Sequence, residues 1–217
     1  MSASAPPAEA KRPLTYVDAL RTIRDVSLAV AREGRSFTID DLDAFPENDG
    51  LRYQLLEGTL VVNPAPVPLH QRMATRILLA LAAACPPGLE VLAGPAGVVL
   101  GPATELQPDV LVVRRDTVRG AKKVTVPPVL VVEVLSPSTR LFDLGSKRLA
   151  YREGGVGAYW LADPAEPRLT TIEWSGDDEV ERTAAGAETI ELDLPFPVAL
   201  RPQALVDDGA SHVRARR

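Results

Sequence analysis

Apolar positions recur along the chain at two spacings, which predict where helices and strands lie. From Leu69 to Cys85 they follow the helical repeat, and Asp143–Glu153 is predicted as another helix, ended by two glycines. Residues 16–33 also show helical spacing. Thr38 and Asp41 have the spacing of a capping box, so we expect a short helix to begin there.

Short apolar runs between these helices predict strands. Tyr53–Leu56 and Thr59–Val62 flank Glu57-Gly58 and predict a hairpin. The run 129–135 is apolar at almost every position, so it belongs in the interior of a sheet. The other predicted strands, in chain order, are 89–100 (interrupted by glycine and proline), 109–113, 158–162, 168–174, 179–183 and 189–192.

This order of elements predicts a mixed α/β (α+β) fold, with a central mixed sheet flanked by helices and extra antiparallel strands. We expect an N-terminal extension with a helix over 1–35, one domain over 36–207, and a disordered basic tail over 208–217. A chain of 217 residues is long enough for one substantial core, because it buries roughly 70% of its unfolded surface.

Composition narrows the class of protein. The chain is 46% apolar and 24% charged, with a net charge of −5, which is the opposite sign to a general nucleic-acid binder. No apolar run approaches the roughly 20 residues of a membrane span, and no secretory signal is visible, so we expect a cytoplasmic protein without membrane contact. With Cys85 as the only cysteine and two histidines, any metal should be a hard cation held by carboxylates.

Two acidic residues stand beside or inside adjacent apolar strands. Glu133 interrupts the run 129–135, where it needs a cationic partner, a metal ion, or an exposed strand end with a structural salt bridge. Asp109 follows Pro108 at the start of the preceding strand, a position also typical of turns. Carboxylates on neighbouring strands can bind one Mg²⁺, which can activate water and stabilise charge on a phosphoryl oxygen.

Lys147 is the third candidate for the chemistry. It shares a helical face with Asp143 and Tyr151, which lie four residues to either side. An ammonium group there can orient water, help it lose a proton, or neutralise charge in a phosphoryl transition state. The alternative is an exposed Asp143–Lys147 ion pair that contributes only a few tenths of a kcal/mol.

Together these segments resemble the Uma-two family, which groups restriction-endonuclease-like proteins of the PD-(D/E)xK nuclease superfamily. The hairpin Tyr53–Leu60, with His70 at the start of the next helix, is similar to the family's N-terminal signature. The other matching segments are Leu106–Asp109, Val132–Thr139, Asp143–Lys147 with Tyr151, and Tyr159–Pro164. The resemblance spans residues 37–200 and implies a restriction endonuclease-like core.

The resemblance implies a magnesium-dependent nuclease acting on DNA, with Mn²⁺ as the alternative metal. Asp109 and Glu133 match the two metal-binding acids, and the carbonyl of Val134 is implied as a further ligand. The superfamily's lysine usually lies two residues after the second acid, where this chain has Leu135. In this family it lies on the following helix, at the position of Lys147.

Several nearby residues bear on whether the site is complete. The family commonly has glutamate where this chain has Gln54, and an amide supplies an oxygen without a charge. Glu57 is close in sequence, but strand alternation puts it on the opposite face unless the turn intervenes. His70 either contacts a phosphate or acts as an acid or base, or is a surface residue at a helix start. Asp143 and Tyr151 are the other accessory candidates.

A basic loop separates the two acidic strands, and it either steers a phosphate backbone towards the site or is simply solvated. Its cations are Arg114, Arg115, Arg119, Lys122 and Lys123. A second function therefore stays open, a non-catalytic nucleic-acid-binding or regulatory module on a nuclease scaffold, which Gln54, Leu135 and the acidic pI favour. A third is a structural subunit that forms a homodimer through the edge strands after residue 168.

Overall fold

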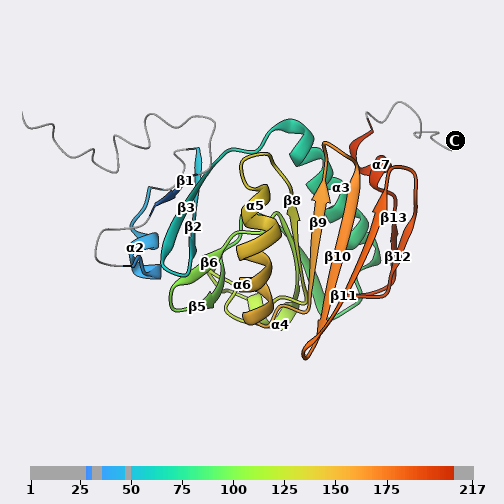
Figure 1. Ribbon diagram of the computed structural model, residues 1–217. Coiled ribbons are helices and arrows are strands. Elements are labelled where there is room, and N and C mark those ends of the chain that lie inside the picture. The colour runs from blue at the N-terminus through green and yellow to red at the C-terminus, as the bar shows by residue number, and fades with distance from the viewer. Residues whose placement is uncertain (1–27, 31–35, 47–49, 208–217) are drawn as a thin grey trace, which may run out of the picture.

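The N-terminal part of the chain forms an antiparallel sheet with the order β1-β3-β2-β6-β5 (Figure 1). The computed structural model describes residues 28–30, 36–46 and 50–207. The strands of this sheet are β1 (Leu28–Val30), β2 (Leu51–Leu56), β3 (Thr59–Pro64), β5 (Val98–Gly101) and β6 (Thr104–Leu106). The predicted hairpin is therefore confirmed as β2 and β3, and the predicted capping box opens α2 (Ile39–Asp43).

A six-stranded central sheet follows, with the order β11-β10-β9-β8-β7-β4. Its strands are β4 (Leu89–Ala93), β7 (Val110–Arg114), β8 (Leu130–Val134), β9 (Ala158–Asp163), β10 (Arg168–Ser175) and β11 (Asp178–Ala185). β8 and β9 are parallel, whereas the other neighbours are antiparallel, so the sheet is mixed. All five residues of β8 are buried, which confirms its predicted place in the interior.

Helices cover both faces of the central sheet (Figure 1). On one face, α3 (Pro68–Ala84) packs with α7 (Pro202–Val206) and with the hairpin of β12 (Ile190–Leu192) and β13 (Val198–Leu200). On the other face lie α5 (Arg140–Phe142), one turn of π-helix η1 (Asp143–Lys147) and α6 (Arg148–Glu153). The expected mixed α/β fold with a flanked central sheet is confirmed.

Alternation along β8 explains how one strand serves both cores. Val132 and Val134 pack in the core that contains α3, while Val131 and Leu135 pack in the core that contains α6. Glu133 has the same parity as Val131, so its side chain projects towards α6. The strand that forms the centre of the sheet thus also presents a carboxylate to one helix.

The segment 89–100 differs from the prediction of a single interrupted strand. It forms β4 in the central sheet and β5 in the N-terminal sheet. The chain passes between the sheets at Gly94, where a Cβ atom would lie 2.1 Å from the carbonyl oxygen of Pro108, so no larger residue fits. β6, β13, α7 and the short helix α4 (Arg115–Val118) were not predicted.

The helix predicted over residues 16–33 is wrong at the residues that can be compared. Leu28–Val30 form β1, antiparallel to β3, because the edge of β3 offers main-chain partners that a short apolar segment can use. The remainder of that helix, and the tail 208–217, lie outside the described residues.

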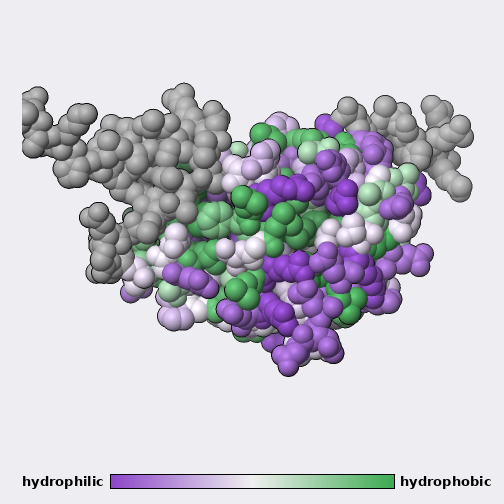
Figure 2. All heavy atoms as spheres, in the orientation of Figure 1, coloured by the Kyte–Doolittle hydropathy of each residue, from purple (hydrophilic) through white to green (hydrophobic). Residues whose placement is uncertain are grey.

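The surface over β10 and β11 is largely hydrophilic (Figure 2). Most positions of the edge strand β11 are exposed, and charged side chains such as Glu181 and Arg182 are typical of edges that avoid pairing with another chain. Dimerisation through these strands stays a prediction. Within the described part of the chain, no helix is both long and apolar enough to span a membrane.

Candidate active site

A cavity of about 370 Å³ lies where the N-terminal sheet, the start of α3 and the ends of β7 and β8 meet. Antiparallel pairing explains why it gathers the predicted acids: Val110 pairs with Val132, so the start of β7 lies against the end of β8. The structure thereby places six of the sequence-predicted site residues in its wall, namely Gln54, His70, Asp109, Glu133, Val134 and Lys147.

The carboxylate of Asp109 is buried and is held by three donors. Arg52 Nη1 donates to Oδ1 at 2.9 Å, the Val134 N–H donates to Oδ2 at 2.9 Å, and His70 Nε2 lies 3.1 Å from Oδ2. Burial raises the pKa of Asp109, but these partners outweigh burial and hold it below its ordinary value. Asp109 is therefore an ionised carboxylate, rather than the exposed turn residue that its position after Pro108 also allowed.

Glu133 is buried on the face of the sheet covered by α6, so the exposed strand end considered from the sequence is wrong. Its Oε1 accepts hydrogen bonds from Lys147 Nζ at 3.0 Å and Tyr151 Oη at 2.8 Å. Burial raises the pKa of the Glu133 carboxyl, the Lys147 ammonium opposes this, and the nearby carboxylates of Asp143 and Asp109 add to it, so the pKa lies above its ordinary value. Among the described residues, no hydrogen bond or ion pair is formed by Oε2 of Glu133.

Lys147 bridges two buried carboxylates. Its Nζ lies 3.0 Å from Glu133 Oε1 and 2.9 Å from Asp143 Oδ1. The predicted Asp143–Lys147 pair exists, but the exposed version is wrong, because both side chains are at most 4% exposed. Burial lowers the pKa of Lys147, yet the two carboxylates outweigh it and raise the pKa, so the ammonium stays charged.

Local backbone geometry brings these groups together. Asp143–Lys147 form one turn of π-helix, a feature often found at functional sites, and both ends of the turn are buried. Thr139 Oγ1 donates to Asp143 Oδ2 at 2.6 Å. Tyr151, one turn further on, has its pKa raised by burial and by Glu133, so it keeps its proton and donates it.

This chain departs from the family pattern at Gln54 and Leu135, and both residues line the cavity. Gln54 lines the cavity, and its Oε1 accepts the N–H of Gln107 at 2.8 Å. Leu135 is buried and also lines the cavity without supplying a charge. Glu57 occupies the β2–β3 turn with an exposed side chain outside the cavity wall, so it does not compensate for Gln54.

His70 is buried in the first turn of α3, so the surface histidine considered from the sequence is wrong. Its Nδ1 has no hydrogen-bond partner among the described residues, and neither has Oδ1 of Asn63, although both side chains are buried and line the cavity. Buried polar atoms are normally satisfied, so these two atoms point to a polar ligand in this cavity.

Arg52 and Asn63 are the site residues that sequence reasoning missed. A usable signal existed for Arg52, because Arg52 and Gln54 are two apart on one strand and therefore share a face. Asn63 is the cross-strand partner of Arg52 in the β2–β3 register. Neither residue type is unusual in a hairpin, so only their contacts distinguish them.

The donors present fit a hard divalent cation that needs few protein ligands. Among the described residues, no group of three or more His, Cys, Asp or Glu side chains is arranged to hold a metal, which argues against an all-protein zinc or calcium cage. Mg²⁺ binds through one or two carboxylates and completes its shell with water and phosphate. Asp109 and Glu133, with the free Oε2 of Glu133, fit that requirement, and Arg52 and His70 compete for Asp109.

The basic loop lies away from this cavity. β7 and β8 are antiparallel, so the loop between them leaves the end of β7 opposite to Asp109. Arg114 follows Asp109 by five residues, which is about 17 Å along an extended strand. None of the five predicted cations of the loop lines the cavity, so the loop does not border the carboxylates.

The chain is similar to a known protein family and to a solved structure. The profile of the Uma2 family, described as "Putative restriction endonuclease", matches residues 39–205. A solved structure, described as "a putative nuclease belonging to DUF820 from Anabaena variabilis ATCC 29413", is similar at a TM-score of 0.65 and 17% identity. The match covers 78% of this chain and 97% of the other, and at this identity it establishes the shared fold. No curated protein matches the chain.

Proposed function

The chain belongs to the Uma2 family, and from this membership and the cavity chemistry we propose that it is a magnesium-dependent nuclease that hydrolyses phosphodiester bonds in DNA. One observation carries the proposal: Asp109 and Glu133 are buried on adjacent strands and line the same cavity as the charged Lys147. Mn²⁺ is the alternative metal.

Asp109 and Glu133 are the side chains that would hold the metal ion, and the main-chain carbonyl of Val134 is the proposed third protein ligand. When bound, the ion would supply a Lewis acid that makes water more acidic and neutralises charge on a phosphate oxygen. Asp109 contributes a permanent negative charge, because its partners hold its pKa low. Tyr151 orients Glu133 by donating to Oε1, which leaves Oε2 for the ion.

Lys147 serves as a fixed positive charge in this proposal. Its pKa is raised, so near neutral pH it does not act as a base. Its ammonium can stabilise the negative charge that builds on the phosphoryl group as the oxygen of water bonds to phosphorus and the bond to the leaving oxygen breaks. Arg52 and the unpartnered atoms of His70 and Asn63 border the same space and can contact phosphate oxygens.

The test is metal binding and cleavage by two isosteric variants, Asp109→Asn and Glu133→Gln. These substitutions remove charge without leaving Arg52 or Lys147 in an empty space. We expect each variant to lose cleavage of a DNA substrate by at least about a hundredfold. We also expect the heat of Mg²⁺ or Mn²⁺ binding, present in the wild type, to disappear when both are combined.

Glu105→Gln is the matched control. Glu105 is a buried glutamate bound to a lysine, with Lys123 Nζ 2.7 Å from its Oε2, but it does not line the cavity. We expect this variant to keep both metal binding and cleavage. Unchanged cleavage by Asp109→Asn and Glu133→Gln would overturn the proposed function.

A non-catalytic nucleic-acid-binding module is the second candidate, favoured by a specific observation. Both oxygens of Asp109 already have side-chain partners, Arg52 on Oδ1 and His70 on Oδ2, so the carboxylate is satisfied without a metal ion. This candidate predicts DNA binding that survives EDTA together with no metal-dependent cleavage by the wild type.

A further inference from the structure

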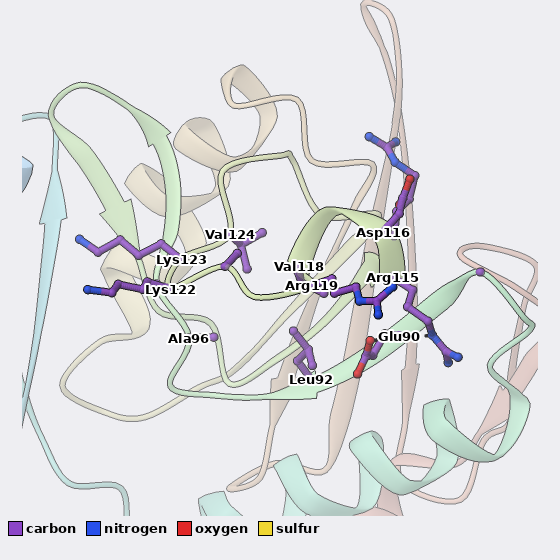
Figure 3. A pocket seen from close by; sticks show the side chains of 14 residues that line it. Glu90, Leu92, Ala96, Arg115, Asp116, Val118, Arg119, Lys122, Lys123 and Val124 are labelled. Carbon is purple, nitrogen blue, oxygen red and sulfur yellow. Dashed lines mark ion pairs between the residues drawn. The ribbon is translucent and has the colours of Figure 1, made fainter.

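A second hollow, of about 1190 Å³, lies at the end of β7 opposite to Asp109 (Figure 3). The segment from Arg114 through α4 to Val124 forms one side, and β4 with the turn at Ala96 and Gly97 forms the other. Leu92, Ala96, Val118 and Val124 give it an apolar floor. It shares no lining residue with the cavity that contains Asp109 and Glu133, which we call the carboxylate cavity.

Most of the charged side chains that line this second hollow are positive, and we call it the basic hollow. Five cations and two acids, Glu90 and Asp116, line it. Two of the cations have partners: Lys123 pairs with Asp43 and Glu105, and Arg115 lies 3.9 Å from Glu90. The cations in question are Arg114, Arg115, Arg119, Lys122 and Lys123.

The other three cations, Arg114, Arg119 and Lys122, are exposed and form no ion pair within the described part of the chain. Other cations of the protein are paired, such as Arg140 with Asp163 and Arg148 with two glutamates. Unpaired like charges beside an apolar floor repel one another and create a positive potential that attracts anions. In a chain with a net charge of −5, this local concentration of positive charge favours a partner that supplies negative charge.

We propose that the basic hollow is a second nucleic-acid site, which binds the phosphodiester backbone of duplex DNA without reading its sequence. Guanidinium and ammonium groups suit phosphate oxygens. Among the described residues that line the hollow there is no aromatic side chain, so it lacks the stacking platforms on which single-strand binders typically hold splayed bases. The site extends the proposed nuclease function, because it holds DNA about 17 Å from the carboxylates along β7.

The test measures duplex binding in EDTA, so it does not depend on catalysis. The triple variant Arg114→Glu, Arg119→Glu and Lys122→Glu should bind a fluorescent duplex of about 30 base pairs at least about tenfold more weakly at low salt, and the slope of log K against log salt should fall by about three. The glutamine triple at the same positions should show an intermediate loss. Thermal melts verify that each variant is folded.

Arg168→Glu, Arg182→Glu and Arg201→Glu form the matched control, since all three side chains are exposed, lie outside the hollow and give the same change in net charge. Equal binding by the wild type and the hollow variant, or an equal loss in the control, would overturn the inference. So would wild-type protein that binds anionic lipid vesicles but no duplex. Duplex binding that depends on the hollow, without any metal-dependent cleavage, would refute the nuclease proposal alone.

Discussion

Arg52 holds the carboxylate of Asp109 from a position 57 residues earlier in the chain. Its Nη1 lies 2.9 Å from Asp109 Oδ1. If Asp109 binds a divalent cation, as we propose, Arg52 and that ion would compete for the same carboxylate. Glu133 is balanced in the same manner by Lys147. At the scale of single residues, the cavity is therefore a set of buried carboxylates neutralised by neighbouring cations.

Replacing Arg52 with methionine should strengthen metal binding. The substitution keeps much of the side-chain volume but removes the positive charge that pairs with Asp109. An ion pair with a partly exposed arginine is worth about 1 kcal/mol, or about fivefold in affinity. Calorimetric titration of Mn²⁺ measures this effect. Arg76→Met, on α3 and outside the cavity, is the control and should leave affinity unchanged. Weaker metal binding by Arg52→Met would contradict the idea of competition.

Asp163 gives a pH-dependent prediction away from the cavity acids. Arg140 and the N–H groups of Ala165 and Glu166 donate to its carboxylate. Burial raises the pKa of Asp163, but these donors outweigh it and hold the pKa below its ordinary value. A depressed folded-state pKa contributes stability that is present above the unfolded value, about 4, and is lost as the pH falls through the folded value.

Asp163→Asn should therefore lower the free energy of unfolding by about 1–3 kcal/mol near neutral pH. The difference from the wild type should shrink as the pH drops below about 4, because the wild-type carboxylate then becomes protonated. Urea unfolding at a series of pH values measures both effects. A difference that grows on acidification would show that the sign of the linkage is wrong.

Single residues also show which members of the site can be identified from the sequence alone. Glu133 and Asp109 could be identified because a charged residue beside or inside an apolar strand is unusual. The only sequence signal for Arg52 was the strand face that it shares with Gln54, because an arginine on a hairpin strand is ordinary until its partner is known. The sequence favoured a surface position for His70, and only the packing of α3 against the start of β7 placed it in the site.

At the scale of elements, one turn of π-helix decides where the lysine lies. The helix predicted over Asp143–Glu153 corresponds to η1 and α6, whereas α5 was not predicted. The π-turn at Asp143–Lys147 was not predicted either, because hydrophobic spacing does not distinguish one wide turn. The interior strands β7, β8 and β9 of the central sheet were predicted well, since each has a buried run of apolar residues, whereas β11 is largely exposed. Shorter elements such as β6 and α4 carry too few residues to show a repeat.

Gly145 in this π-turn provides a test at the element scale. A Cβ atom there would meet no neighbouring atom within 4 Å. Gly145→Ala should raise the free energy of unfolding by about 0.5–1 kcal/mol, because alanine restricts the unfolded chain and favours helix. The matched substitution Gly157→Ala should destabilise, because its Cβ would lie 2.7 Å from the carbonyl oxygen of Val129. Denaturant unfolding compares them, and destabilisation by Gly145→Ala would show that the turn needs glycine's backbone freedom.

At the scale of the whole molecule, the two larger sheets place the carboxylate cavity and the basic hollow apart from each other. The carboxylate cavity lies where the sheets meet, and the basic hollow lies at the opposite end of β7. The sequence placed the acids and the basic loop next to one another in the chain, and that proximity suggested a shared site. Antiparallel pairing of β7 and β8 separates them, since the loop joins the ends that are distant from the acids.

The resemblance to a known family indicated the site role of Lys147 and the family itself. Apart from that resemblance, the sequence by itself determined the mixed α/β class, the interior position of β8, the β2–β3 hairpin, and the two acids beside or inside adjacent strands. These features depend on local periodicity and residue type, which report the burial of each face without knowledge of its partner. Only the tertiary structure decided that segment 89–100 serves two sheets, that Arg52 and His70 hold Asp109, and that the basic loop lies apart. Those outcomes depend on strand direction, register and contacts between distant segments, which the local pattern of apolar and polar residues does not specify.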